Sequence, residues 1–220
     1  MSTDSIGWRS GKLSHDLPDL PELETYFPDN FKSIMTLISG GITYREALFL
    51  AELSAQLQSG CIVEVGSFKG RSAIALSVGA ASSGADVQIF CIEPHAPFRG
   101  INGGIFGPAD RKEFYKAMLA TGAYKNTALV NLTSPEITPN WERRVSLCFI
   151  DGDHSYEGVK VDFEYWSPKI VDGGYLILDD ASAPHMGPTK LKSEILALPQ
   201  WDAIEAPGKF AAFRKNARSQ

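Results

Sequence analysis

The stretch from Val145 to Asp180 constrains the fold most strongly, because it holds two apolar runs that each end in acidic residues. Residues 145–150 are followed by the letters DGDH, and residues 175–178 are followed by two aspartates. Between the runs, residues 155–170 carry apolar side chains at helical spacing, and DGG at 172–174 predicts a turn. A strand–helix–strand unit of this kind has parallel strands, so we expect both acidic ends at the same edge of a sheet.

The acids at these strand ends predict a ligand site with a divalent cation. Ligands of open α/β sheets bind outside the carboxyl ends of the strands, where Asp151, Asp153, Asp179 and Asp180 would gather. Crowded carboxylates repel one another and bind protons unless a cation neutralises them. A divalent ion with oxygen ligands meets that need. The alternative is that Asp151 and Asp153 form a turn and cap the following helix, which leaves Asp179 and Asp180 unexplained.

A second signal is a strand, a glycine turn and a helix at residues 61–65, 66–72 and 73–81. Gly66 and Gly70 would let a ligand approach the backbone closely. Their spacing is G-x-x-x-G, so the pyrophosphate fingerprint G-x-G-x-x-G is missing, and so is the P-loop lysine. Glu64 lies inside the predicted strand, where an acid needs a partner, and the ammonium group of a ligand would serve.

The next predicted strand, residues 87–92, ends at Glu93, an acid placed to bind ribose hydroxyls or simply to face solvent. The loop 94–108 is rich in glycine, proline and aromatic residues, and we expect it to overhang a substrate pocket. Residues 1–42 read as an N-terminal arm or a lid, and a capping box at Thr43 and Glu46 opens a domain over residues 43–220. Runs at 201–204 and 210–213 predict a terminal hairpin.

Composition narrows the classes of function. The chain has 220 residues, of which 44% are hydrophobic, enough for one core. A net charge of −5 without a basic stripe argues against nucleic acid as a partner. The three cysteines, Cys61, Cys91 and Cys148, lie in apolar runs and are expected to be buried free thiols. No run approaches the roughly 20 apolar residues of a membrane span, so we expect no membrane partner and a cytoplasmic protein, with a homo-oligomer left open.

Residues 63–72, VEVGSFKGRS, resemble the first motif of class I S-adenosylmethionine (SAM) methyltransferases. The segments FIDGDHSYEGVKVD, from Phe149, and WSPKIVDGGYLILDD, from Trp166, are a more specific match. They resemble the metal-dependent O-methyltransferases, a branch that includes the catechol type and enzymes acting on antibiotic and sugar hydroxyls. The likeness covers about residues 43–213, and the N-terminal arm and the loop 94–108 match nothing.

This resemblance implies an α/β fold: a Rossmann-like, seven-stranded, mostly parallel sheet with an antiparallel last strand and helices on both faces. It implies SAM and Mg²⁺, or another divalent cation, as cofactors. Asp151, Asp179 and Asp180 correspond to the metal ligands, and Asp153 or His154 to the catalytic base. The residues that would bind SAM are Glu64, Gly66, Ser67, Gly70, Ser72, Glu93, Ser134 and Asp151.

The sequence therefore predicts a SAM-dependent, Mg²⁺-dependent O-methyltransferase that methylates a hydroxyl of a small molecule, such as a sugar or a phenolic natural product. One alternative is an NAD-dependent oxidoreductase on a similar sheet, against which the missing G-x-G-x-x-G speaks. Another is a non-catalytic relative that binds SAM without turnover. The four intact aspartates argue against this second alternative.

Overall fold

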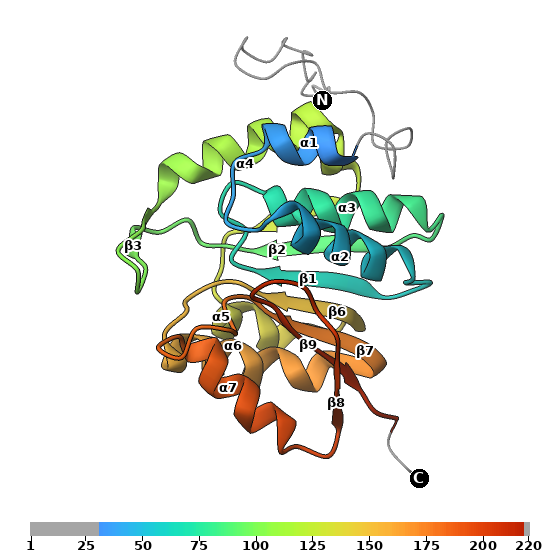
Figure 1. The fold of residues 1–220 in the computed structure, drawn as a ribbon. Helices are drawn as coiled ribbons and strands as arrows, with labels where there is room; N and C mark the ends of the chain where they lie inside the picture. Colours follow the sequence, from blue (N-terminus) through green and yellow to red (C-terminus); the bar gives the residue numbers. More distant parts are fainter. Residues whose placement is uncertain (1–30, 218–220) are drawn as a thin grey trace, which may run out of the picture.

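The computed structural model describes residues 31–217, which form a seven-stranded sheet between two layers of helices (Figure 1). In order across the sheet, the strands are β5 (Thr127–Val130), β2 (Gln88–Ile92), β1 (Cys61–Val65), β6 (Val145–Ile150), β7 (Ile170–Leu178), β9 (Ala211–Lys215) and β8 (Trp201–Ile204). β9 is antiparallel to both of its neighbours, and all other neighbours are parallel. The predicted fold class and the terminal hairpin are confirmed.

Helices cover both faces of the sheet, as predicted (Figure 1). One face carries α1 (Phe31–Leu37), α2 (Tyr44–Ala55), α3 (Arg71–Ser82) and α4 (Pro108–Thr121), and the other carries α5 (Ser134–Ile137), α6 (Tyr156–Trp166) and α7 (Gly187–Leu196). Short 3-10 turns are η2 (Ala123–Lys125), η3 (Thr138–Asn140) and η4 (Ser167–Lys169). β1 and β6 are buried along their whole length, because each face of the sheet packs against an apolar cluster.

The loops that follow β1 and β6 meet at the carboxyl edge of the sheet. The Asp151 N–H donates to the Val65 carbonyl over 2.8 Å, and the Asp179 N–H donates to the Ile150 carbonyl over 3.0 Å. Gly66 has φ +84, and a Cβ there would stand 2.2 Å from the Asp151 carbonyl oxygen. Glycine is required at this position, because any side chain would push the two loops apart.

Two local predictions need correction. The turn predicted at 172–174 lies inside β7, where Val145 pairs with Ile170 but Leu147 pairs with Tyr175. The extra residues of β7 form a bulge that contains Gly173 with φ +78. The helix predicted over 155–170 ends at Trp166 and continues as η4, because Pro168 has no N–H to extend the α-helical pattern.

The part of the predicted N-terminal arm that is described, residues 31–42, packs on the domain. Phe31, Ile34 and Met35 are buried, and the Arg71 guanidinium donates to the carbonyls of Met35 and Ile38. The aromatic residues Trp8, Tyr26 and Phe27 of the arm lie outside the described residues.

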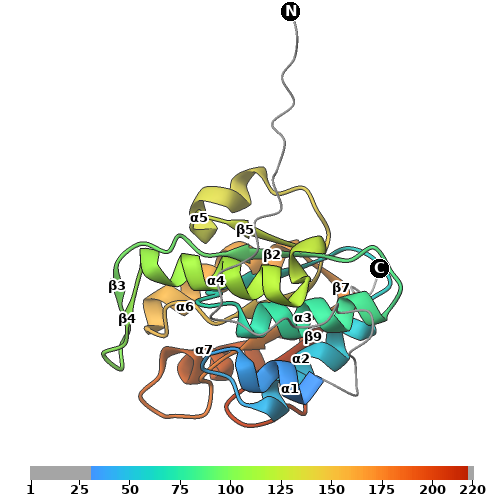
Figure 2. The same cartoon turned by 90° about the horizontal axis from the view of Figure 1, so that it is seen from above.

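The loop 94–108 folds into a small hairpin, β3 (Phe98–Arg99) and β4 (Ile105–Phe106), which projects from the body in both views (Figures 1 and 2). Phe106 packs edge-on against Phe68 of the glycine turn, and Ile105 is 82% exposed. The three cysteines are buried free thiols, as predicted. Among residues 31–217, no helix has the length and apolar character that crossing a membrane requires.

Candidate active site

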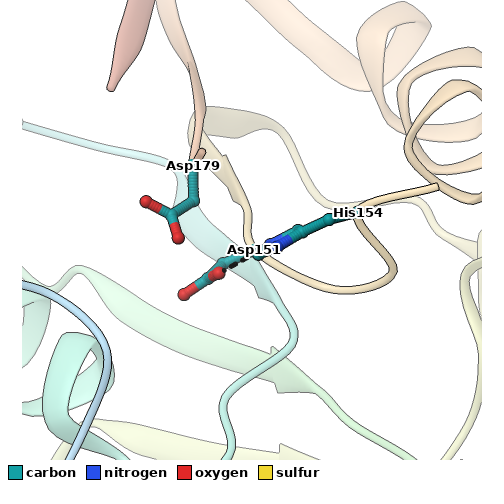
Figure 3. Close-up of side chains that lie close together, drawn as sticks. All are labelled: Asp151, His154 and Asp179. Carbon is teal, nitrogen blue, oxygen red and sulfur yellow. Dashed lines mark hydrogen bonds and ion pairs between the residues drawn. The ribbon is translucent and has the colours of Figure 1, made fainter. Parts of the chain in front are cut away.

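A cluster of charged side chains occupies the carboxyl ends of β6 and β7. Asp151 follows β6, and Asp179 and Asp180 follow β7. His154 lies between them, with Nε2 3.1 Å from Asp151 Oδ1 and Nδ1 3.0 Å from Asp180 Oδ2. Ligand atoms of Asp151, His154 and Asp179 all lie within 4.8 Å of one another. Figure 3 shows the carboxyl groups of Asp151 and Asp179 directed toward the same space, with the His154 imidazole beside Asp151.

Lys209 completes the cluster, and the sequence analysis did not identify it. Its Nζ lies 2.7 Å from Asp179 Oδ2 and 2.9 Å from Asp180 Oδ1. It belongs to the loop between β8 and β9, and Leu178 pairs with Ala211, so the loop reaches the edge where β7 ends. The signal that could have found it is the predicted terminal hairpin, because an antiparallel strand beside β7 must begin next to the acids.

Burial and charge shift the protonation equilibria of this cluster. Asp179 is 1% exposed, and its Oδ1 accepts no hydrogen bond from residues 31–217. Burial, together with the nearby Asp151 carboxylate, raises the pKa of Asp179 well above its usual range, although Lys209 opposes the shift. Burial disfavours the charged form of His154, but hydrogen bonds to Asp151 and Asp180 outweigh it and raise the pKa of His154 to about 10. The hydrogen bond from His154, aided by Lys209, lowers the pKa of Asp180 to about 2.

The structure does not bring Asp153 into the cluster. Its carboxylate accepts the Ser155 N–H and the Ser155 hydroxyl, both over 2.9 Å, at the start of α6. Ser155 Oγ in turn accepts the Gly158 N–H over 3.0 Å and caps the helix. The alternative given for the DGDH segment therefore describes Asp153 as a turn-forming acid that holds the capping residue Ser155, whereas Asp151 faces Asp179 across the strand ends.

Several residues predicted to bind SAM line a small pocket beside the cluster. Gly66, Ser67, Ser72 and Asp151 form one part of its wall, and Gly40 and Gly41 form another. Gly70 has φ +90 at the start of α3 and lies just outside this lining. The glycine turn and the acid cluster are thus neighbours that share Asp151.

Glu64 is fully buried behind the glycine turn. Its Oε2 accepts the Cys91 thiol over 3.1 Å, while its Oε1 accepts no hydrogen bond within the described chain. Burial raises the pKa of Glu64 to about 7, and the nearby hydroxyls of Ser72 and Ser67 and the Cys91 thiol oppose the shift. A cationic ligand group would stabilise the ionised form of this carboxyl.

Glu93 and Ser134 already have protein partners. The Glu93 carboxylate accepts the Phe68 N–H over 3.3 Å and the His95 N–H over 2.8 Å, so it holds the glycine turn to the end of β2. Ser134 is buried, and its hydroxyl donates to Asp162 over 2.6 Å and accepts the Trp166 indole N–H over 2.9 Å. Each Glu93 oxygen keeps a lone pair for a ligand, but the Ser134 hydroxyl has its donor and one acceptor site occupied.

Three solved structures illustrate the likeness of the fold to known proteins. The O-methyltransferase from Bacillus cereus, in complex with S-adenosylhomocysteine (SAH), is 17% identical, with a TM-score of 0.63 over 87% of this chain and 94% of that one. The O-methyltransferase TomG from Streptomyces achromogenes, involved in tomaymycin synthesis and solved with SAM, is 14% identical, with a TM-score of 0.61 over 85% and 86%.

An rRNA methylase from Streptococcus thermophilus is 11% identical, with a TM-score of 0.58 over 81% of this chain and 100% of that one. A search among curated proteins gives no significant sequence match. Residues 63–181, which run from β1 through the acid cluster, match the family model described as a methyltransferase domain. Because this match spans more than half of the chain, the chain belongs to the methyltransferase domain family.

Proposed function

We propose that this protein is a SAM-dependent O-methyltransferase that acts on a hydroxyl of a small molecule and uses a divalent cation such as Mg²⁺. The observation that carries the proposal is the shared position of two features at the carboxyl edge of the sheet. The glycine turn with Gly66 and Ser72 lines one side of a pocket, and Asp151 lines both that pocket and the acid cluster. A methyl donor and an acceptor hydroxyl could therefore bind side by side.

The residues of the cluster fit a divalent cation. Asp179 Oδ1 is buried without a hydrogen bond from the described residues, and the carboxyl groups of Asp179 and Asp151 are directed toward the same space (Figure 3). Carboxylate oxygens are the ligands that Mg²⁺ prefers, and Asp151, Asp179 and Asp180 are the proposed ones. A bound Mg²⁺ would supply Lewis acidity, which makes the hydroxyl of the acceptor easier to deprotonate.

The reaction breaks a carbon–sulfur bond, forms a carbon–oxygen bond and releases the hydroxyl proton, which needs an acceptor. We propose His154 as this base, because it lies inside the cluster whereas the Asp153 carboxylate is bonded to Ser155, the residue that caps α6. With its pKa raised to about 10, His154 is protonated at neutral pH and donates to both aspartates. Neutralisation of Asp151 and Asp180 would remove the interactions that raise the pKa of His154, and the neutral ring could then accept the proton.

The acceptor is proposed to be a sugar or a phenolic compound. O-methyltransferases are among the proteins that share the fold, and this supports oxygen as the methylated atom. An rRNA methylase shares the fold as well, so the fold alone does not select the acceptor. The net charge of −5 argues against nucleic acid, because binding to phosphates requires a basic surface.

The test is transfer of a labelled methyl group from SAM to a panel of catechols, other phenols and sugars, with Mg²⁺ or with EDTA. We expect transfer to at least one hydroxyl compound, its loss with EDTA and its recovery with added Mg²⁺. Asp179→Asn should lower kcat by at least about a hundredfold, since one charged group in an active site contributes several kcal/mol. The exposed Asp86 provides a matched control, and Asp86→Asn should keep wild-type activity.

Methyl transfer that is unaffected by EDTA would contradict the proposed role of a divalent cation. SAM binding without turnover on any acceptor would favour the non-catalytic alternative. Competition by NAD⁺ for the SAM site would instead favour the oxidoreductase.

A further inference from the structure

Lys209 places a positive charge directly against the acids of the proposed cation site. Its ammonium bridges Asp179 Oδ2 and Asp180 Oδ1 at 2.7 and 2.9 Å, so it engages two of the three proposed metal ligands at once. Its side chain is 26% exposed, whereas that of Asp179 is 2% exposed. An ammonium held this close to a buried carboxylate neutralises charge that a divalent cation would otherwise neutralise.

The main chain fixes Lys209 in this place. Its N–H donates to Glu46 Oε1 over 3.0 Å, and its carbonyl accepts the Ala181 N–H over 2.8 Å, directly after Asp180. Gly208 has φ +60, and a Cβ there would meet Glu46 Oε1 at 2.2 Å, so the loop lies tightly against the start of α2. The backbone hydrogen bonds therefore fix the main chain of Lys209 beside the cluster, and only its side chain can move away.

The Lys209 ammonium and a bound dication would both be attracted to the same carboxylates. Asp151, Asp179 and Asp180 are three carboxyl groups, and Lys209 and His154 are the cationic groups that contact them in the described structure. A dication that binds Asp179 and Asp180 would lie within a few ångströms of the ammonium and would repel it. The Asp179 and Asp180 oxygens therefore cannot bind the Lys209 ammonium and the dication strongly at the same time.

We infer that Lys209 is a built-in competitor of the divalent cation: its ammonium binds the Asp179 and Asp180 oxygens that the ion needs and must withdraw from them before the ion binds. This inference rests on the proposed cation site, and it assigns Lys209 the role of setting the affinity of that site. The affinity for divalent cations is accordingly weaker than three carboxylates alone would give.

The test measures Mn²⁺ binding to the full-length protein by calorimetry and by the electron paramagnetic resonance signal of free Mn²⁺. The variants are Lys209→Met, which keeps the length of the side chain without its charge, and Lys209→Arg, which keeps the charge. Lys160→Met is the matched control, because Lys160 pairs with Glu194 between α6 and α7 and its loss also removes one positive charge. Far-ultraviolet circular dichroism and thermal melting check that each variant is folded.

We expect Lys209→Met to lower the Kd for Mn²⁺ at least about tenfold, since removal of an adjacent unit charge acts directly on the bound ion. Lys209→Arg keeps the charge beside the ion, and Lys160→Met removes a charge that pairs with Glu194 and is screened by solvent. Both variants should therefore stay within about twofold of the wild type. A folded Lys209→Met protein with unchanged or weaker Mn²⁺ binding would overturn the inference while leaving the proposed cation site standing. Absence of Mn²⁺ binding in both wild type and Lys209→Met at millimolar concentrations would overturn both, and methyl transfer in EDTA would then show that the methyltransferase activity stands without a metal.

Discussion

Glu64 is a carboxyl group that the fold buries completely within β1, beside the glycine turn. Its burial raises its pKa to about 7 from a value of 4.5, so the folded protein holds this proton more tightly than the unfolded chain does. The folded state therefore gains most from Glu64 when the carboxyl is protonated, below pH 4.5. That gain is lost as the pH rises from 4.5 through 7.

We predict that Glu64→Gln weakens the dependence of stability on pH. Between pH 5 and pH 8, the free energy of unfolding of the wild type should fall by on the order of 3 kcal/mol more than that of the variant. Urea unfolding of both proteins at the two pH values measures this difference, because other titrating groups contribute to both alike. Parallel pH profiles would mean that Glu64 is ionised at low pH through a partner that the described contacts lack.

At the scale of the elements, α2 is tied to the acid cluster by a single buried carboxylate. Glu46 Oε2 accepts the Thr43 N–H over 2.6 Å in the capping box, and Glu46 Oε1 accepts the Lys209 N–H over 3.0 Å. The capping box was predicted from the sequence, but the second bond joins residues 163 positions apart. A residue in the first turn of α2 thus also holds the loop that carries Lys209.

We predict that Glu46→Gln destabilises the protein by about 1–3 kcal/mol, because an amide group would point an N–H at one of two backbone N–H donors. The loop 205–210 should also exchange its amide hydrogens faster, as measured by mass spectrometry. Glu52→Gln, at an exposed position of the same helix, should change stability by less than about 0.5 kcal/mol. Equal effects of the two substitutions would refute the link between α2 and this loop.

A second buried bond network joins α5 to α6 through Ser134, Asp162 and Trp166. Ser134→Ala would leave the Trp166 N–H and one Asp162 oxygen without this partner, and we predict a loss of about 1–3 kcal/mol of stability in urea unfolding. Ser193→Ala, on the exposed side of α7, is the control and should cost less than about 0.5 kcal/mol. A Ser134→Ala protein as stable as wild type, with weaker SAH binding, would instead favour the predicted role of Ser134 in binding SAM.

For the whole molecule, the sequence was sufficient to predict the sheet and the edge that carries the site. Asp151, Asp179 and the glycine turn could be located because each follows a strand of one parallel sheet, and such strands end at a common edge. For Lys209 the terminal hairpin predicts only that its loop lies near this edge, because the contact of its side chain with the acids also depends on the conformation of the loop after β8 and on the reach of a long side chain. Asp153 and His154 are adjacent on one turn, and sequence gives no indication of which side chain faces the cluster.

Two further differences between the predictions from sequence and the structure have local causes. The DGG signal at 172–174 does mark a residue with positive φ, but β7 continues through it because β6 pairs with β7 on both sides of the bulge. The hairpin β3–β4 has two residues in each strand, too few to show the alternation that predicts strands.

The most direct test of the account is a calorimetric titration of SAH into the wild-type protein, with NAD⁺ titrated separately as the comparison. The account predicts saturable binding of SAH at one site per chain and no saturable binding of NAD⁺. Absence of SAH binding at millimolar concentrations, or tighter binding of NAD⁺ than of SAH, would contradict the central claim that the pocket beside Asp151 holds a methyl donor.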